Sequence, residues 1–198
     1  MLDHEKRGHL LSAVHKIWHG GFTLIELMIA IVIFSITLSL GVSSYQRWVL
    51  NAQIRNAAES IQDGIQRARG EAVKCNGRAA FTLGALSAWM VTHVDACGTL
   101  AAGSVLESRF SSEGSKRATV AVTPVNTATI TFGSLGTIVA NTNGSATPTQ
   151  FDISVPPSAV IPGMRPLRVA IGVAGQTRVC DPDPSITNKT PPDPRRCF

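Results

Sequence analysis

The sequence contains one apolar run, Phe22 to Tyr45, that is long enough to cross a lipid bilayer. Its 24 residues would extend about 36 Å as an α-helix, and the hydrocarbon core of a bilayer is about 30 Å thick. The residues before it are polar and include Lys6, Arg7 and Lys16, so the positive-inside tendency keeps the N-terminus cytoplasmic and exports whatever follows Tyr45. We therefore predict one membrane helix followed by an exported part.

The run holds a single charged side chain, Glu26, close to its start. An acidic group inside a membrane segment costs about 2.5 to 3.5 kcal/mol on insertion scales, so the segment would span a bilayer more readily without it. We therefore expect a partner that compensates this charge. The glutamate also argues against a conventional secretory signal peptide, the alternative for which Ser39-Leu40-Gly41 would supply a small-x-small cleavage site.

Helical character continues beyond Tyr45 without a break. Small and aliphatic residues recur at steps of three and four and form one narrow stripe: Ile54, Ala58, Ile61, Ile65, Ala68 and Ala72. Asn76-Gly77 then supplies a stop signal. Together the two segments predict one helix of roughly 54 residues, about 80 Å long, whose only weak points are Gly41 and Gly64. A cleaved secretory signal would not lead into such a helix.

Composition and histidine placement leave an enzyme reading with little support. Hydrophobic residues make up 44% of the chain and charged residues 16%, which is typical of a folded domain and not of a disordered tail. The net charge of +5 is spread along the chain and is too small to indicate nucleic-acid binding by itself. Only His93 follows the apolar run, and we find no nucleophile elbow, P-loop or HExxH motif. We interpret His93 as an ordinary strand residue.

The cysteines are Cys75, Cys97, Cys180 and Cys197, all beyond the apolar run. They show no CxxC spacing and the later pair has no nearby histidine, so we expect neither a metal nor a cofactor. An even number of cysteines beyond a membrane-targeting segment favours disulfides formed in an oxidising compartment, with four buried thiols as the alternative. Of the three possible connectivities we favour the one that joins nearest neighbours in the sequence, Cys75 with Cys97 and Cys180 with Cys197. Each disulfide would close a loop of about 20 residues and stabilise the fold by about 3 kcal/mol in the chain-entropy model.

After Asn76, short β-prone runs alternate with turn signals. We predict strands at Arg78–Leu83, Ala88–Val94, Val105–Phe110, Ala118–Thr123, Ala128–Phe132, Thr137–Ala140, Phe151–Val155, Leu167–Val173 and Gln176–Val179, with the last two joined by a turn at Ala174-Gly175. One sheet built from them would bury a face against the apolar stripe of the helix, with Trp89 and Phe132 in the core. The predicted class is α+β, a long N-terminal helix packed on an antiparallel sheet.

The stretch GGFTLIELMIAIVIF, from Gly20 to Phe34, resembles the class III leader of type IV pilins and pseudopilins. The resemblance implies that prepilin peptidase cuts between Gly21 and Phe22 on the cytoplasmic side and that the new Phe22 amine is methylated. It also implies that Glu26 pairs with the N-terminal amine of a neighbouring subunit. Such a pair would neutralise two charges that are each unfavourable alone, and a helix N-terminus favours an anion as well.

The later features resemble the subfamily that combines type II secretion protein H with fimbrial biogenesis protein T. The stretches that carry this resemblance are ARGEAVKCNG, ITFGSLGTI and LRVAIGVAGQTRVC, with Trp89 and Cys97 between the first two. They imply a pilin fold and a structural subunit that is either a minor type IV pilin or a type II secretion pseudopilin. The implied partners are other pilin or pseudopilin subunits, prepilin peptidase and the bacterial inner membrane, with the head periplasmic before assembly into a pilus or pseudopilus.

These features divide the chain into successive parts. The predicted parts are a cytoplasmic leader that is removed (1–21), a transmembrane and assembly helix (22–45), the amphipathic half of the helix (46–76), a β-rich head (77–179) and a disulfide-bounded tail (180–198).

Some fimbrial members of this subfamily bind DNA during natural transformation through a C-terminal Gly-Arg-x-Arg stretch. Gly175 to Arg178 correspond to it here, and Gln176 replaces the first arginine. The candidate DNA-binding residues are Arg178, Lys189, Arg195 and Arg196, which would contact phosphates without reading bases. The stretch from Arg178 to Phe198 also contains Asp181, Asp183 and Asp193 and nets only about +1, whereas phosphate binding needs several uncompensated cations. DNA binding is therefore the less favoured hypothesis, and a solvated interaction tail pinned by Cys180–Cys197 is the favoured one.

Overall fold

The computed structural model describes residues 21–187 and 190–197, which belong to two compact units that divide between Val42 and Ser43. Helix α1 (Leu24–Lys74) begins in the first unit and ends in the second. At its start the Oγ1 atom of Thr23 accepts a hydrogen bond of 3.3 Å from the backbone N–H of Glu26. Thr followed three residues later by Glu is a capping-box pattern, which satisfies an N–H that lacks a partner within the helix.

The described side chains of the first unit from Phe22 to Ser39 are all exposed. The hydroxyls of Ser35, Thr37 and Ser39 donate to backbone carbonyls three or four residues earlier, so they add little free polarity to this surface. An apolar helix exposed on every side is stable only when lipid or other apolar surfaces surround it.

We next ask whether α1 has the length and composition of a membrane-spanning helix. Among the described residues no helix by itself is long and apolar enough to qualify, whereas the segments Leu24–Ser39 and Ser44–Lys74 qualify as a pair, by length and composition alone. The single span predicted over residues 22–45 therefore stays a prediction.

In the second unit, the apolar stripe of α1 forms the centre of the hydrophobic core. Its predicted members are all fully buried: Ile54, Ala58, Ile61, Ile65, Ala68 and Ala72. Burying each isoleucine side chain stabilises the folded protein by roughly 1.5 to 3 kcal/mol, so the stripe holds the helix to the strands. The interpretation of the three-and-four periodicity is confirmed.

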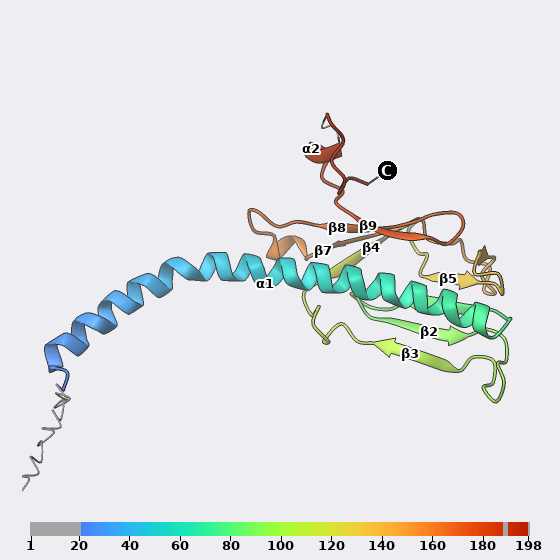
Figure 1. The fold of residues 1–198 in the computed structure, drawn as a ribbon, viewed down its shortest axis with the longest axis horizontal. Coiled ribbons are helices and arrows are strands. Elements are labelled where there is room, and N and C mark those ends of the chain that lie inside the picture. The colour runs from blue at the N-terminus through green and yellow to red at the C-terminus, as the bar shows by residue number, and fades with distance from the viewer. Residues whose placement is uncertain (1–20, 188–189, 198) are drawn as a thin grey trace, which may run out of the picture. The chain divides into compact units, whose positions relative to one another are not determined.

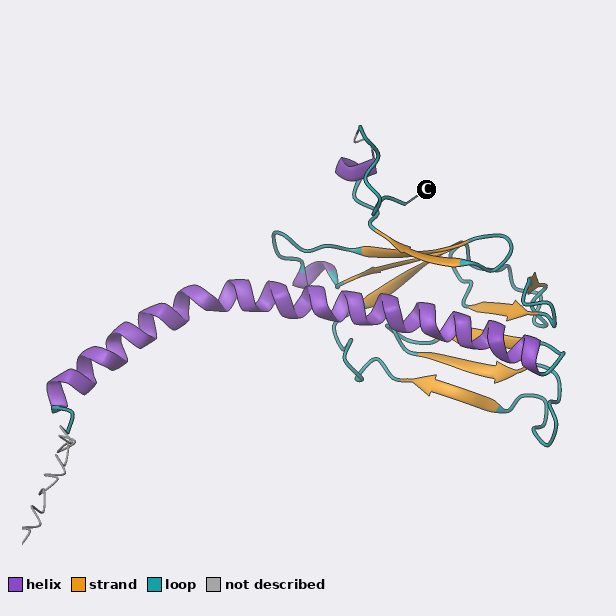
Figure 2. Ribbon diagram, viewed as in Figure 1, coloured by secondary structure: helices purple, strands orange, loops and turns teal. Residues whose placement is uncertain are grey.

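The strands form two antiparallel sheets, and the prediction of a single sheet was wrong (Figures 1 and 2). The first sheet has the order β3-β2-β1-β5-β6 and contains β1 (Ala79–Leu83), β2 (Trp89–His93), β3 (Val105–Arg109), β5 (Thr129–Phe132) and β6 (Ile138–Val139). The second has the order β4-β7-β8-β9 and contains β4 (Thr119–Thr123), β7 (Gln150–Ser154), β8 (Leu167–Ile171) and β9 (Thr177–Cys180). Two short helical segments, Pro157–Ala159 and α2 (Pro184–Thr187), complete the described elements.

Strand positions and the hairpin of β8 with β9 were predicted well, but the division of the strands between two sheets was not predicted. Each predicted strand has a counterpart whose ends differ by at most two residues from the predicted ends. The split into two sheets arises because β5 returns to pair with β1, with Ala79 opposite Phe132, and leaves β4 to pair with β7. Alternation within a run indicates where a strand lies, whereas its partner depends on contacts far away along the chain.

Aromatic side chains join the two sheets in one core. Phe81 of β1, Phe132 of β5 and Phe151 of β7 are fully buried, and the ring centroids of Phe81 and Phe151 are 6.1 Å apart. Trp89 is also buried, so its predicted core position and that of Phe132 are confirmed. The predicted turn at Ala174-Gly175 joins β8 to β9, with Gly175 N–H donating to Gly172 O at 2.8 Å.

Candidate assembly and interaction sites

The residues predicted for processing and assembly lie at the start of the described chain. Gly21 and Phe22 precede α1 in non-helical backbone, and the side chain of Phe22 is 81% exposed. An exposed, non-helical segment is the kind of backbone that a protease can bind. The rest of the predicted leader lies outside the described residues.

Glu26 lies in the first turn of α1, where its carboxylate interacts favourably with the helix dipole. It is exposed and forms no ion pair with any residue that the structure describes. The sequence indicated that the carboxylate of Glu26 needs a partner. A different contact was not predicted: the backbone N–H of Glu26 donates a hydrogen bond to Oγ1 of Thr23. The Thr-x-x-Glu spacing was the available signal for it.

A groove of about 560 Å³ lies within the second unit, between α1, the second sheet and the C-terminal tail. Its lining includes the arginines Arg55, Arg165, Arg178 and Arg195, against the two carboxylates of Glu59 and Asp181. The fold thus brings two of the predicted DNA-binding residues together with two arginines from distant parts of the chain. Sequence reasoning missed these two because they become neighbours only when the loop before β8 reaches α1.

The C-terminal tail folds back over the end of β9. The N–H of Asp181 donates to Arg195 O at 2.7 Å, and Arg178 Nη2 donates to Pro194 O at 2.7 Å. Arg195 forms an ion pair of 2.8 Å with Asp193, whose hydrogen bond raises the pKa of this guanidinium above its ordinary value. Arg178 and Arg195 therefore help to hold the tail.

The other two candidate cations of the tail differ in how much is described. The backbone of Arg196 forms an isolated parallel β-bridge with the backbone of Asp181. Arg196 directly precedes Cys197 of the second disulfide. Lys189 lies outside the described residues.

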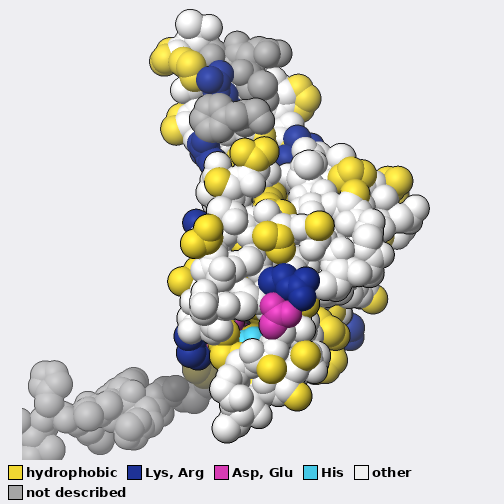
Figure 3. Space-filling model, turned by 90° about the vertical axis from the view of Figure 1, so that its right-hand side faces the viewer, with side chains coloured by type: hydrophobic (Ala, Val, Ile, Leu, Met, Phe, Trp, Pro, Cys, Tyr) yellow, Lys and Arg dark blue, Asp and Glu magenta, His cyan; other side chains and the backbone are white. Residues whose placement is uncertain are grey.

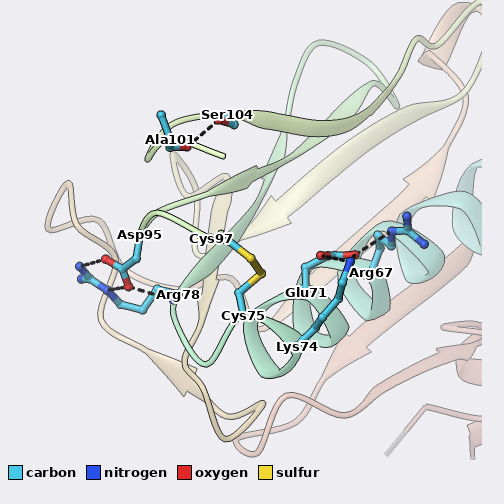
Figure 4. Close-up of a disulfide and its surroundings, with 9 residues drawn as sticks. All are labelled: Arg67, Glu71, Lys74, Cys75, Arg78, Asp95, Cys97, Ala101 and Ser104. Atoms are coloured by element: carbon cyan, nitrogen blue, oxygen red, sulfur yellow. Dashed lines mark hydrogen bonds and ion pairs between the residues drawn. A yellow bond between two sulfur atoms is a disulfide. The ribbon is translucent and has the colours of Figure 1, made fainter. Parts of the chain in front are cut away.

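Both predicted disulfides are present. Cys75 directly follows α1 and Cys97 follows β2, and their Cα atoms are 5.3 Å apart (Figure 4). Cys180, the last residue of β9, is joined to Cys197 with a Cα separation of 5.1 Å. The first bond fixes the end of the helix to the first sheet, and the second fixes the tail to the second sheet.

An ion pair lies beside the first disulfide (Figure 4). The carboxylate of Asp95 accepts hydrogen bonds from the backbone N–H of Arg78 at 2.9 Å and from Nε and Nη2 of the same residue at 3.0 and 2.7 Å. The hydrogen bonds from the Arg78 side chain are the main reason that the pKa of Asp95 is lowered below its ordinary value. On the face shown in Figure 3, Lys and Arg side chains form separate groups among uncharged ones, and one group lies against acidic side chains.

A processing motif, an exposed apolar helix and an α+β head with disulfides together define a pilin-like structural subunit. The family model described as type II transport protein GspH matches residues 57–175, and that of the prokaryotic N-terminal methylation motif matches residues 19–42. Because the first match covers more than half of the 198 residues, the chain belongs to the GspH family.

Two solved structures of the type IV minor pilin FimU from Pseudomonas aeruginosa, strain PAO1, align with the chain. The structure in space group P21 gives a TM-score of 0.46 at 16% identity and covers 66% of this chain and 92% of that one. The structure in space group P65 gives 0.42 at 20% identity and covers 65% and 97%. The comparison with curated proteins gives no match.

Proposed function

We propose that the protein is a minor type IV pilin, a structural subunit that takes part in pilus assembly. The observation that carries this proposal is the methylation motif over residues 19–42, in which Glu26 lies in the first turn of an apolar helix with exposed sides. Such a helix is a poor surface for water and a good one for packing against lipid and then against other subunits. The helix is the part that assembles, and the head carries the surface loops and the tail.

In this proposal the subunit is first held in the inner membrane, with its N-terminus cytoplasmic and its head periplasmic. Prepilin peptidase cleaves after Gly21, and the exposed Phe22 amine is methylated. In the filament Glu26 pairs with the terminal amine of a neighbouring subunit. A buried charge left without its partner costs about 3 to 5 kcal/mol, so the pair favours correct assembly over a displaced register.

The same stalk would also build a type II secretion pseudopilus, and the family description as a type II transport protein favours this second candidate. A deletion strain separates the two. Loss of twitching motility with normal exoprotein secretion, restored by the wild-type gene, is expected for a pilus subunit. Loss of secretion alone would assign the protein to a pseudopilus, and unchanged twitching and secretion would contradict both.

DNA binding during transformation is a further candidate role, less favoured because of the nearby carboxylates and favoured by the four arginines that line the groove beside the tail. Contacts with phosphates would make binding weaken steeply with salt. The test is a mobility-shift assay with the detergent-solubilised protein, comparing wild type with the triple variant Arg178→Ala, Arg195→Ala, Arg196→Ala. Arg117→Ala, an exposed arginine outside the groove, is the control. A shift that the triple variant loses and the control keeps is expected; identical shifts, or none at low salt, would end the idea.

A further inference from the structure

The first disulfide has a buried histidine beside it. Cys75 follows α1, Cys97 follows β2, and His93 is the last residue of β2. The two sulfur atoms and an imidazole nitrogen of His93 all lie within 4.8 Å of one another. Among the described residues no other group of three His, Cys, Asp or Glu side chains comes together in this way.

The imidazole of His93 lacks the partners that a buried polar ring ordinarily has. The residue is 1% exposed, and neither Nδ1 nor Nε2 forms a hydrogen bond. Leaving a buried polar group unpaired costs about 1 to 3 kcal/mol, and most such groups in native proteins are paired. The backbone of His93 is paired normally, with its N–H donating to Ser104 O at 3.0 Å and its carbonyl accepting from Gly103 N at 2.8 Å. The unmet requirement therefore belongs to the ring alone.

We propose that Cys75, Cys97 and His93 bind a zinc ion when their disulfide is reduced. Two thiolates and an imidazole are ligands that Zn²⁺ prefers, and three protein ligands leave a fourth position for water. Both cysteines are half-buried and His93 is buried, so the site is more enclosed on the histidine side than on the cysteine side. One imidazole nitrogen of His93 would bind the zinc ion and so gain the partner that it lacks in the oxidised protein.

Charge favours a divalent ion over a monovalent one at this site. Two thiolates cancel the charge of Zn²⁺, whereas a Cu⁺ ion on the same ligands would leave one negative charge beside a buried ring. Uncompensated charge is costly where water is excluded, so the neutral zinc complex is the better fit.

The reaction that opens the site balances with one co-reactant, a dithiol. The dithiol supplies two electrons and two protons, breaks the Cys75–Cys97 bond and leaves as a cyclic disulfide. Zn²⁺ then replaces both thiol protons, which pass to solvent. Zinc in the reduced protein and the disulfide in the oxidised protein would each join the end of α1 to β2, so the connection would be kept in either redox state.

The sequence carried a weak signal for this site that was overlooked. His93 precedes Cys97 with three residues between them, and ligands in structural zinc sites often have such short spacings. Interpreting His93 as an ordinary strand residue was correct for its position in β2. Sequence spacing alone did not predict that a nitrogen of its ring lies within 4.8 Å of the sulfur atoms of Cys75 and Cys97.

The test measures zinc bound to the full chain, purified in detergent without a polyhistidine tag. The protein is reduced with dithiothreitol under inert gas, desalted, mixed with zinc chloride and passed through a second desalting column before zinc is counted by mass spectrometry. The double variant Cys180→Ser, Cys197→Ser is the matched control because no described histidine lies beside that disulfide. Oxidised protein serves as the blank, because it reports zinc held by the four histidines before the apolar run.

The expected result is one additional zinc ion per chain in the reduced wild type and in the control variant. Cys75→Ser with Cys97→Ser should bind no more than the blank, and His93→Gln should bind at least about tenfold more weakly in competition with a chromogenic chelator. Equal zinc in reduced and oxidised wild type would overturn the proposal, and so would unchanged affinity in His93→Gln.

A second measurement keeps the proposal testable if His93→Gln does not fold. X-ray absorption at the zinc edge of the reduced control variant, which keeps only Cys75 and Cys97, should show two sulfur neighbours and at least one imidazole nitrogen. A spectrum with the two sulfurs and no imidazole would exclude His93 as a ligand, and a spectrum without sulfur would exclude the site.

Discussion

The indole N–H of Trp89 donates a hydrogen bond of 2.7 Å to the hydroxyl of Ser60, inside the core. Trp89 lies in β2 and Ser60 in α1, and both residues are buried. Gly64, one turn further along the helix, provides the space for the ring: a Cβ atom there would lie 2.9 Å from Trp89 and 2.8 Å from Phe81. The contact between helix and sheet therefore depends on a hydroxyl at position 60 and on the absence of a side chain at position 64.

Gly64→Ala is expected to destabilise the protein by about 1 to 3 kcal/mol, because the added methyl group forces two packed aromatic rings to move. Intrinsic helix propensity predicts the opposite sign, since alanine is favoured over glycine by about 1 kcal/mol. Gly70→Ala in the same helix is the matched control, because a Cβ atom there meets nothing within 4 Å. Gly70 is a further weak point of the helix that the sequence prediction of Gly41 and Gly64 left out. Urea unfolding of the detergent-solubilised chain, followed by near-ultraviolet circular dichroism, should shift the two variants in opposite directions. A shift in the same direction would show that the close approach at Gly64 is not limiting.

Asp95→Asn should lower stability at neutral pH and leave it unchanged in acid. The pKa of Asp95 is lower in the folded protein than its ordinary value of 3.8, so its ionised form stabilises the fold above that value. This contribution is lost as the pH falls through the lowered pKa. Both side chains of the Arg78–Asp95 pair are partly exposed, so the effect should be small and should shrink with added salt.

The measurement compares the urea midpoints of wild type and Asp95→Asn at pH 7 and at an acidic pH below the lowered pKa of Asp95, where the carboxylate is protonated in both states. The gap between the two proteins should be present at pH 7 and absent in acid. A gap of the same size at both pH values would mean that the asparagine acts through packing instead of through charge.

Local rules were sufficient for the elements of this fold and insufficient for their partners. The buried stripe from Ile54 to Ala72 follows from helical periodicity, which is set by neighbours three and four residues apart. The pairing of β5 with β1 is a contact between segments about 50 residues apart, which no local pattern encodes. Gly64 was interpreted as a weak point for the same reason, because propensity does not include the rings of Phe81 and Trp89 on a distant strand.

The candidate sites divide in the same way. The processing motif and Glu26 are contiguous in sequence and could be recognised directly, whereas the groove joins Arg55 of α1 to Arg165 and Arg178 near the other end of the chain. The disulfides lie between these cases, because nearest-neighbour pairing closes short loops at low entropic cost. The ring of His93 was out of reach, since its isolation inside the core is a property of the packed structure.

Gly175→Ala is expected to destabilise the head more than an alanine at an open glycine with the same backbone conformation. Gly175 has φ of +82°, and a Cβ atom there would lie 2.6 Å from Phe132 Cε1. Gly144 has φ of +71° with nothing within 4 Å, so Gly144→Ala carries only the backbone strain of about 1 to 2 kcal/mol. The additional steric term at Gly175 is about 1 to 3 kcal/mol.

Thermal unfolding of the two glycine variants, followed by circular dichroism, checks this difference. Equal losses would show that Phe132 moves aside freely. The outcome also bears on the Gly-x-x-Arg stretch from Gly175 to Arg178, because a stability defect in Gly175→Ala would account for impaired function without any contact between this glycine and DNA.

Glu26→Ala is expected to leave leader cleavage intact and to reduce incorporation into filaments by tenfold or more. Removing the carboxylate leaves the amine of a neighbouring subunit unpaired, at a cost of about 3 to 5 kcal/mol when the pair is buried, and about 1.4 kcal/mol corresponds to a factor of ten. Glu26→Gln, which keeps the size and loses the charge, should behave in the same way. Thr23→Ala removes the hydroxyl that accepts the Glu26 N–H, costs about 1 kcal/mol at the helix start and keeps the carboxylate, so it should assemble nearly normally.

Immunoblots of sheared filaments and of membranes measure the ratio of assembled to membrane-held subunit for each variant. Normal incorporation of Glu26→Ala would remove the charge pair from the mechanism, and a defect in Thr23→Ala as large as that in Glu26→Ala would mean that the glutamate acts by organising the first turn of the helix.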